Sequence, residues 1–583
     1  MNLWERLAAR KQPHQGLVVW RGGEPEAGNE MHRIIGLPTV EPTPWDGSSV
    51  RKSAGIDLRP LQQQALGAIH EAKGGFFPLA VGAGKTYVSV LAGAALGCDL
   101  AILLVPPRTV QQTYDALAKA DGCFRLPRTE VVPYSILSRP EASDLLERLI
   151  SGYAPERVVI VADEAHNLKR FTSARTKRVV RFFDAHPGVR FVAMSGTLTS
   201  RSIKDFAHLA EWALGEGSPV PRMSHPHGRT ALAHWSSCID SEGRPGTLEW
   251  TWCEPLWRWA GMEPANILMA HYTDRREGVR KALARRIATA PGVVSTTESS
   301  LGTALYIERW TSLKTPSEIT AAMSDVEDTQ CRPDGEALES PVEQWRVQRQ
   351  LSLGFYYRWV WPNGEPDVEW LVARSDWNKA VRQQLDRHAG EGYDSPLLVF
   401  NRTAREHAAG QRRAIHRAWE EWCRVKDRPT PPTEAVWVSR KVVDTVSAEV
   451  LHSKEPVLVW YSDDAVATAL AQCGMEVVPA GKPVPVDRPR TLAVSVRSHG
   501  TGLNLQPWAH NLILTPDQSG LVWEQLLGRT HRPGQEADEV WATVLAHTFA
   551  FRDALAAAKV NAEYIQHTTG QKQKLLLATH LEK

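Results

Sequence analysis

Short apolar runs that end in chemically distinctive residues constrain the fold of this chain most strongly. The clearest is Val158-Val-Ile-Val-Ala162, which leads directly into the acids Asp163 and Glu164. A run this short and rich in Val and Ile is typical of a strand buried on both faces of a parallel sheet. In such sheets, ligands bind beyond the carboxyl ends of the strands. The sequence therefore predicts an α/β fold whose chemistry lies at strand ends.

Two series of apolar runs, separated by a long stretch of different character, predict two parallel-sheet lobes. The first series comprises Leu79-Ala-Val, Ala101-Ile-Leu-Leu-Val105, Val158 to Val161 and Phe191-Val-Ala-Met194. The second comprises Val457-Leu-Val-Trp-Tyr461, Leu492-Ala-Val-Ser-Val496, Asn511-Leu-Ile-Leu514 and Val540-Trp-Ala-Thr-Val544. We divide the chain into a lead-in (1–50), a first lobe (51–205), a mainly helical, Trp-rich elaboration (206–455), a second lobe (456–545) and closing helices (546–583).

Length and composition favour a multidomain cytoplasmic protein. The 583 residues exceed one ordinary core, and 43% hydrophobic with 23% charged residues is typical of globular domains. The formal charge of +2 makes any attraction to nucleic acid a matter of local patches. Seven cysteines without a Cys-x-x-Cys pair fit a reducing compartment, and no apolar segment predicts a signal peptide or membrane span.

The elaboration carries two local predictions. Residues 355–361 and 368–372 flank Pro362-Asn363-Gly364, which predicts a β-hairpin because Asn-Gly accepts positive φ angles. Residues 401–426 predict one amphipathic helix. Its apolar face would carry Ala408, Ile415, Trp419 and Trp422, and the opposite face Arg402, Arg413, Arg417 and Arg424.

Tryptophan is concentrated in the elaboration, with eleven residues between Trp235 and Trp377. Such side chains either fill a core or stack on bases and partner proteins. A second open question is a zinc site, which can be drawn from His225, His227, His234, Cys238 and Cys253, although the spacing matches no standard finger.

A phosphate-binding loop is indicated by Gly82-Ala83-Gly84-Lys85-Thr86. The glycines let backbone N–H groups approach phosphate oxygens, the lysine reaches the terminal phosphates, and the threonine hydroxyl can hold Mg²⁺. The full eight-residue pattern would begin with glycine, where Leu79 stands. An ordinary glycine turn at a helix start is the alternative.

Asp163, Glu164 and two distal arginines would complete an ATP site. Asp163 would bind Mg²⁺ through water, while Glu164 would deprotonate the water that attacks the γ-phosphate. Arg529 and Arg532, within 524–535, would stabilise the charge that develops there. The alternatives are a solvated acidic turn and surface salt bridges.

These segments occur in the order of superfamily 2 helicases, and they resemble the Swi/Snf-like DNA translocase branch over about 300 of the 583 residues. The matching segments are Leu58-Arg-Pro-Leu-Gln62, Leu79 to Thr86, Val105 to Thr109, the DEAH-type box Asp163 to Lys169, Ser195-Gly-Thr197, Ser498 to Leu505 and Gln525 to Gln535. His531-Arg-Pro-Gly-Gln535 after Gly528-Arg529 is typical of this branch.

The resemblance implies two RecA-like lobes of a P-loop NTPase that hydrolyse ATP with Mg²⁺ and move along double-stranded DNA. By residue, it implies catalytic roles for Lys85, Asp163, Glu164, Arg529 and Arg532; nucleotide contacts for Gln62, Gly82, Ala83, Gly84, Lys85, Thr86, Gly502 and Gln525; Mg²⁺ ligation by Thr86 and Asp163; nucleic-acid contacts for Arg108, Thr109, Ser135, Arg497 and Ser498; and coupling by His166, Ser195 and Thr197.

The sequence also departs from the branch, since Ser195-Gly-Thr-Leu198 stands where Thr-Gly-Thr-Pro is usual. The nearest alternative is a strand-separating helicase on DNA or RNA, and one of another class is a nucleic-acid-binding scaffold with weak ATPase activity. The arginine face of 402–424 and the basic run from Arg275 to Arg286 would either extend a DNA footprint or form solvated charged faces. A protein partner such as a nuclease would dock on the Trp-rich region. We expect a protein of a bacterial or phage-infected cytoplasm, without membrane association.

Overall fold

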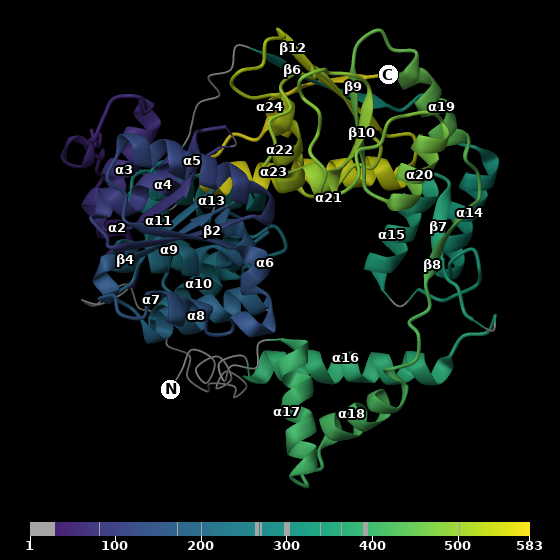
Figure 1. Cartoon of the computed structure of the whole chain (residues 1–583), viewed down its shortest axis with the longest axis horizontal. Coiled ribbons are helices and arrows are strands. Elements are labelled where there is room, and N and C mark those ends of the chain that lie inside the picture. Colours follow the sequence, from purple (N-terminus) through teal and green to yellow (C-terminus); the bar gives the residue numbers. More distant parts are fainter. Residues whose placement is uncertain are drawn as a thin grey trace. The chain divides into compact units, whose positions relative to one another are not determined.

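A computed structural model describes residues 30–583 except Val81, Thr172, Thr197, Ser200, 263–266, 269–270, 296–302, Glu339, Asn363, 389–394 and Thr501. The chain divides into two compact units, and each is described by itself. Unit 1 takes its described residues from 30–297, 367–428 and 564–571. Unit 2 takes its own from 298–366, 429–563 and 572–583. Figure 1 labels their elements along the chain.

The sheet of unit 1 is parallel, and its described strands lie in the order β1-β5-β4-β2-β3. Their bounds are β1 Gly75–Pro78, β2 Leu100–Val105, β3 Arg128–Pro133, β4 Val158–Asp163 and β5 Arg190–Ser195. The predicted strand at Leu79 is wrong in position, because β1 ends one residue earlier and Leu79 already belongs to the turn. The other three runs of the first series form strands as predicted.

The helices of unit 1 that precede residue 297 connect and cover these strands (Figure 1), whereas the three that follow residue 367 pack around a small core of their own. The α-helices are α2 Glu30–Gly36, α3 Pro60–Ala72, α4 Lys85–Leu96, α5 Val110–Cys123, α6 Tyr134–Leu137, α7 Leu145–Ile150, α8 Ala174–Ala185, α9 Ala207–Leu214, α10 Pro226–Ile239, α11 Thr247–Trp259, α13 Tyr272–Ala288, α16 Val368–His388, α17 Pro396–Ala408 and α18 Ala414–Val425. Short 3-10 turns lie at η2 Ser48–Val50, η3 Pro107–Thr109, η4 Pro140–Ala142, η5 Pro155–Arg157, η6 Ala165–Leu168, η7 Ile203–Asp205 and η8 Gly215–Gly217.

Strand β4 shows why the apolar runs are continuous. Val158, Ile160 and Ala162 pack in a core with side chains of α8 and α9. Val159 and Val161 point to the opposite face and pack with α3, α4 and α5. Side chains alternate between the two faces of a strand, and here both faces are buried, so every position must be apolar.

The sheet of unit 2 is also parallel, and its described strands lie in the order β10-β9-β11-β12-β6-β13. The strands are β6 Ala304–Trp310, β9 Val457–Tyr461, β10 Leu492–Ser495, β11 His510–Ile513, β12 Glu539–Leu545 and β13 Thr579–Glu582. All four runs of the second series form strands. Strand β6 comes from the segment predicted as elaboration, and β13 from the segment predicted as closing helices, so this sheet gathers distant parts of the sequence.

Unit 2 has helices on both faces of its sheet, as Val457 and Val459 pack with α15, α19 and α20 while Leu458 and Trp460 pack with α22 and α23. The helices are α14 Ser317–Thr329, α15 Pro341–Ser352, α19 Lys441–Leu451, α20 Asp464–Gln472, α21 Val496–His499, α22 Gly520–Thr530, α23 Phe549–Thr569, whose last residues belong to unit 1, and α24 Lys574–Leu577. The predicted fold class is confirmed: an α/β chain has two parallel sheets and, between them in sequence, a helical Trp-rich region.

The hairpin prediction is wrong. Strand β7, Phe355–Trp359, pairs antiparallel with β8, Thr433–Trp437, and residues 368–372 begin helix α16 instead of a second strand. Asn363 itself lies outside the described residues. Strand β7 ends before the turn residues, as the sequence predicted, but the strand that pairs with it lies much later in the chain.

The single helix predicted for 401–426 is also wrong, because α17 ends at Ala408 and α18 begins at Ala414. Gly410 lies between them with φ 84°, a left-handed conformation that interrupts a helix. The predicted apolar face is partly confirmed: Ile415, Trp419 and Trp422 pack around a small core with residues of α16 and α17.

Most of the tryptophans that the structure describes in the elaboration fill cores. Trp235, Trp250 and Trp257 are buried in unit 1, as are Trp370 and Trp377 of the α16 segment. The packing interpretation is therefore confirmed for these five. Among the described helices, none combines the length and apolar character that crossing a lipid bilayer requires.

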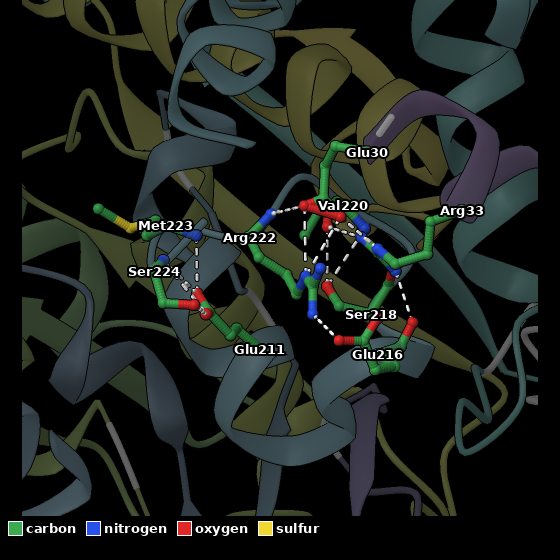
Figure 2. Close-up of polar contacts among 9 residues, drawn as sticks. All are labelled: Glu30, Arg33, Glu211, Glu216, Ser218, Val220, Arg222, Met223 and Ser224. Atoms are coloured by element: carbon green, nitrogen blue, oxygen red, sulfur yellow. Dashed lines mark hydrogen bonds and ion pairs between the residues drawn. The ribbon is translucent and has the colours of Figure 1, made fainter. Parts of the chain in front are cut away.

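Helix α2 is tied to the later chain by a cluster of charges (Figure 2). The Glu30 carboxylate, 1% exposed, accepts from Arg33 and from Arg222 Nε, the latter at 3.2 Å. Arg33 also donates to the carbonyl oxygen of Ser218 at 2.6 Å, and Arg222 pairs with Glu216. A buried carboxylate needs such partners, so these contacts fix the start of the described chain on the segment after α9.

Candidate active site

Strands β1, β5 and β4 are neighbours, so the segments that follow them meet at one edge of the sheet in unit 1. The phosphate-loop candidate follows β1, Ser195 ends β5, and Asp163 ends β4. Parallel strands present their carboxyl ends on the same side, which brings these three segments together although they are far apart in sequence.

The loop before α4 requires glycine at two positions. Gly82 has φ 89° and Gly84, the residue that caps α4, has φ 84°. Both lie in the left-handed region that favours glycine. A Cβ atom at Gly84 would also lie 2.5 Å from the side-chain nitrogen of Gln62. The first N–H groups of α4 lack partners within the helix, and Gly84, which precedes them, has no side chain to cover them. An anion-binding turn needs N–H groups that are open in this way.

Lys85 and Glu164 form the centre of the candidate site. Lys85 Nζ lies 2.8 Å from Glu164 Oε1, and the two side chains are 9% and 18% exposed. The other carboxylate oxygen, Oε2, lies 3.3 Å from His166 Nδ1 and accepts from Ser195 Oγ at 3.4 Å. His166 Nδ1 and Ser195 Oγ are 2.9 Å apart. One carboxylate thus contacts all three segments of the sheet edge.

The backbone holds Glu164 in an unusual conformation. Its φ is 51°, in the left-handed region, which costs a non-glycine residue roughly 1–2 kcal/mol. Its N–H donates to Asp163 Oδ1 at 3.0 Å, and its carbonyl accepts from the Asn167 side chain at 2.9 Å. These bonds offset the strain and turn the carboxylate toward Lys85.

The two acids have pKa values shifted in opposite directions. Burial, and after it the adjacent Glu164 carboxylate, raise the pKa of Asp163 from 3.8 to about 6. Burial acts in the same direction on Glu164, but Lys85 and His166 outweigh it and hold the Glu164 pKa well below its usual range. Glu164 is therefore ionised at neutral pH, as a base must be.

Gln62 contacts the phosphate loop directly. Its side-chain oxygen accepts from the Arg59 backbone N–H at 2.8 Å, and its side-chain nitrogen donates to the Gly84 carbonyl at 2.9 Å. The residue is 3% exposed. In this conformation both amide atoms hold the backbone around the loop.

The residues present fit a nucleotide with Mg²⁺. Within the described part of the chain, no three His, Cys, Asp or Glu side chains gather in a way that would hold a metal by themselves, so the zinc site drawn from the sequence has no support. Mg²⁺ usually takes one or two protein oxygens and completes its shell with phosphates and water. Thr86, next to the loop lysine, and Asp163, beside Glu164, would supply such oxygens.

In unit 2 the predicted arginines converge on one turn. Arg529, 5% exposed, donates from Nη1 to the Leu503 carbonyl at 3.0 Å and from Nε to the Gln525 carbonyl at 2.9 Å. Arg532 donates to the same Leu503 carbonyl at 3.4 Å and to Asn504 Oδ1 at 2.5 Å. Gly502, with φ 79°, begins this turn. The segments predicted to act together in unit 2 are thus in contact.

The predicted nucleic-acid residues differ in accessibility. Arg108, Ser135 and Arg497 are exposed, whereas Ser498 is buried at 7%. Thr109 uses its hydroxyl to donate to the Pro106 carbonyl at 3.0 Å. The third coupling residue, Thr197, lies outside the described residues.

Arginines of the basic run in α13 donate hydrogen bonds to other segments of unit 1. Arg280 Nε donates to the Ile239 carbonyl at 2.7 Å, and Arg276 donates to the Gly243 carbonyl at 2.6 Å. Arg286, fully buried, donates to the Leu37 carbonyl at 2.9 Å. These guanidinium groups satisfy backbone carbonyls at helix ends and turns. The structure therefore does not support this run as a DNA-binding face.

Tyr134 is a residue of the site that the sequence analysis missed. It is buried and follows β3 directly, and its hydroxyl donates to the Asp163 carbonyl at 2.9 Å. The available signal was its position, since an aromatic hydroxyl at a strand's carboxyl end lies on the same sheet edge as the acids.

The chain matches none of the family models against which it was scanned, and a search of curated proteins finds no relative.

Proposed function

We propose that this protein is an ATP hydrolase that translocates along double-stranded DNA, and that it works in the cytoplasm. The observation that carries the proposal is the group formed by Lys85, Glu164, His166 and Ser195, in which one ionised carboxylate touches the ends of β4 and β5 and the lysine that follows β1. A lysine at a glycine-bounded helix start, beside a carboxylate pair, suits phosphoryl transfer better than other reactions.

The Lys85–Glu164 pair suggests how hydrolysis would be timed. A triphosphate carries more negative charge than one carboxylate and would compete with Glu164 for the Lys85 ammonium. Once Lys85 turns to the phosphates, the Glu164 carboxylate is free to accept a proton from the attacking water, while His166 and Ser195 keep its other oxygen in place. Mg²⁺, held by Thr86 and Asp163, would offset phosphate charge.

The proposal assigns Arg529 and Arg532 of unit 2 to the γ-phosphate, and the acceptor that the two arginines share at present is the Leu503 carbonyl. A carbonyl is a weaker partner for a guanidinium than a phosphate oxygen, so this bond is one that a nucleotide would replace. The exposed Arg108 and Arg497 are the candidate contacts to the phosphate backbone of DNA, which position a protein without reading sequence.

ATP turnover by the wild type and by Glu164→Gln tests the proposal, measured without nucleic acid and with single-stranded DNA, duplex DNA or duplex RNA at matched salt. We expect duplex DNA to stimulate the wild type and Glu164→Gln to reduce turnover by about a hundredfold or more. Glu277→Gln, which alters an exposed Glu–Lys pair of the same unit, is the matched control and should leave turnover unchanged.

The other outcomes assign other functions. Stimulation by single strands or RNA, with displacement of a labelled strand, would favour a helicase. Turnover that ignores every nucleic acid, or that survives in Glu164→Gln, would contradict the proposed enzyme and favour a nucleic-acid-binding scaffold.

A further inference from the structure

The connection between α17 and α18 in unit 1 carries a concentration of arginine. Residues 402–417 contain five arginines and one glutamate, with no lysine or aspartate, whereas the whole chain has a formal charge of only +2. Figure 1 shows that this turn lies at the end of the helix pair remote from α16. Like charges repel, so an excess of this kind destabilises the turn unless an anion compensates it.

On the helices themselves, arginines of this group are paired with carboxylates. Arg402 pairs with Glu406 within α17, and Arg417 pairs with Glu421 at 3.1 Å within α18. The positive charge of these two arginines is therefore largely cancelled where it stands. Both belong to the arginine face that the sequence predicted, so that face as a whole is not the basic surface of this region.

Arg405, Arg412 and Arg413, the turn arginines, are exposed and form no ion pair in the described part of the chain. Arg412 donates from Nη1 to the carbonyls of His407 and Gln411, both at 2.9 Å. Arg405 donates from Nε to a backbone carbonyl at 3.4 Å. Because a guanidinium has five N–H groups, most of those on the turn arginines stay open to a ligand.

The backbone of the turn is held in one conformation. Gly410 has φ 84°, and the Arg413 backbone N–H donates to Nδ1 of the fully buried His416 at 2.8 Å. Behind the turn, the three helices pack around the buried Trp377 and Val399. Cations on a fixed turn need little ordering of the backbone when they bind a ligand, which favours affinity.

The chemistry of the turn suits a chain of phosphates. Guanidinium groups bind phosphate oxygens through paired, charge-assisted hydrogen bonds. The turn arginines are exposed and come from both α17 and the connection, so they can each meet a different phosphate. A membrane surface fits less well, because residues 408–414 read Ala-Ala-Gly-Gln-Arg-Arg-Ala and hold no large apolar side chain that could insert among lipids.

We propose that the turn arginines bind the phosphate backbone of double-stranded DNA, on a helical hairpin separate in sequence from the motifs of the candidate ATP site. Phosphate contacts carry no sequence information, so this turn would hold duplex DNA of any sequence. The choice of DNA as the polyanion rests on the proposed function. The contact itself requires no ATP.

The test measures binding of a labelled DNA duplex by fluorescence anisotropy at several salt concentrations, without nucleotide. The test variant replaces all three turn arginines by glutamine. The matched control removes the same charge from three exposed arginines of unit 1 that each form an ion pair, Arg128→Gln, Arg148→Gln and Arg258→Gln. Circular dichroism and the unfolding midpoint report whether each protein is folded.

We expect the test variant to lose affinity by about tenfold or more at low salt, and the control to stay within about twofold of the wild type. Each phosphate contact adds about 0.9 to the slope of log affinity against log salt, so the slope should become shallower by about two to three. Lysine at the same three positions should restore the slope, because the slope depends on charge.

A second variant guards against a folding defect. Arg405→Gln/Arg413→Gln spares the bonds that Arg412 makes at the end of α17. We expect it to show about two thirds of the change in slope, since it removes two of the three contacts, and to keep the wild-type unfolding midpoint. If the triple variant does not fold, this double variant decides the question.

Several results would overturn the proposal. They are wild-type affinity and slope in the folded variants, equal losses in the test variant and the control, a wild type that binds no duplex DNA, or a loss confined to duplex RNA or to phosphatidylserine vesicles. The proposed function fails separately, when the wild type hydrolyses no ATP, and the anisotropy measurement still decides what the turn binds. An active enzyme whose variants bind DNA normally would refute only the role of the turn.

Discussion

Replacing Lys85 by methionine tests whether the pair with Glu164 holds the candidate site in its observed state. The substitution keeps the length and apolar stem of the side chain but leaves the Glu164 carboxylate, 18% exposed, without its cation. Removing one partner of a buried ion pair typically costs about 3–5 kcal/mol. His166 and Ser195 still contact Glu164, so we expect a loss near the lower end, about 3 kcal/mol at pH 7.

The measurement must report on unit 1 alone, because a protein with two units need not unfold in one step. Amide hydrogen exchange of β4, in the core of the sheet, gives the free energy of opening for that unit. Lys281→Met is the matched control, since Lys281 forms a pair of 2.6 Å with Glu277 in which the side chains are 59% and 45% exposed. We expect it to change stability by less than about 0.5 kcal/mol.

The double variant Lys85→Met/Glu164→Gln distinguishes charge from packing. If an uncompensated carboxylate causes the loss, neutralising Glu164 should restore most of the stability. A double variant no more stable than Lys85→Met would refute that reasoning and assign the loss to the lysine stem. Wild-type stability in Lys85→Met would show that the pair does not hold Glu164 ionised.

Two buried titratable groups and two glycines give further predictions. Burial raises the pKa of Asp240 to about 6 from 3.8, so its contribution to stability is complete at low pH and is lost as the pH rises through 6. Asp240→Asn should remove this loss of stability, which amounts to up to about 3 kcal/mol. If the substitution changed the unfolding free energy equally at about pH 4 and at about pH 7, the prediction would be contradicted. Burial lowers the pKa of His208 to about 4 from 6.5, so the sign is opposite: stability is lost as the pH falls through 4. His208→Gln should therefore remove this fall in unfolding free energy at acid pH, which amounts to up to about 3 kcal/mol. Gly67→Ala would place a Cβ atom 1.9 Å from the Thr43 carbonyl oxygen and should cost about 1–3 kcal/mol or more in thermal unfolding. A Cβ atom added at Gly122 would meet no described atom within 4 Å, so Gly122→Ala should stabilise the protein by up to about 1 kcal/mol. Equal unfolding free energies for Gly67→Ala and Gly122→Ala would contradict this reasoning.

The buried strands could be predicted from the sequence because both of their faces are covered. Val158 to Ala162 must be apolar throughout, and such a run is visible without knowledge of its neighbours. Strands β6 and β13 were missed for the opposite reason. β6 contains Glu308 and Arg309, and the outermost strand β13 is largely polar, so neither differs locally from a loop or a helix.

The wrong predictions in the elaboration arose from trusting local signals. The turn before α16 resembled a hairpin, but the partner of β7 is β8, which pairs Phe355 with Trp437. No local pattern contains that pairing. The helix break at Gly410 was visible as a glycine, but an isolated glycine within a periodic run does not by itself end a helix.

The identity of the candidate residues was readable, but their mutual contacts were not. Lys85, Asp163 and Glu164 stand out because glycine turns and strand ends restrict what such residues do. The left-handed backbone of Glu164, its bond to Lys85 and the two bonds of Gln62 depend on how β1 and β4 are placed around β5. Only the folded sheet determines these distances.

The discontinuous composition of unit 1 has a consequence for how the protein is made. Unit 1 draws on residues 30–297, 367–428 and 564–571. A ribosome releases the last of these pieces only after all of the described strands except β13 have left it. Until then the Asp240 carboxylate has no tyrosine hydroxyl, and the surface that Tyr564 and Ile565 will cover stays open to water or to a chaperone. Chains stalled before residue 564 should therefore expose this surface, and synthesis itself would set the moment at which the first unit closes.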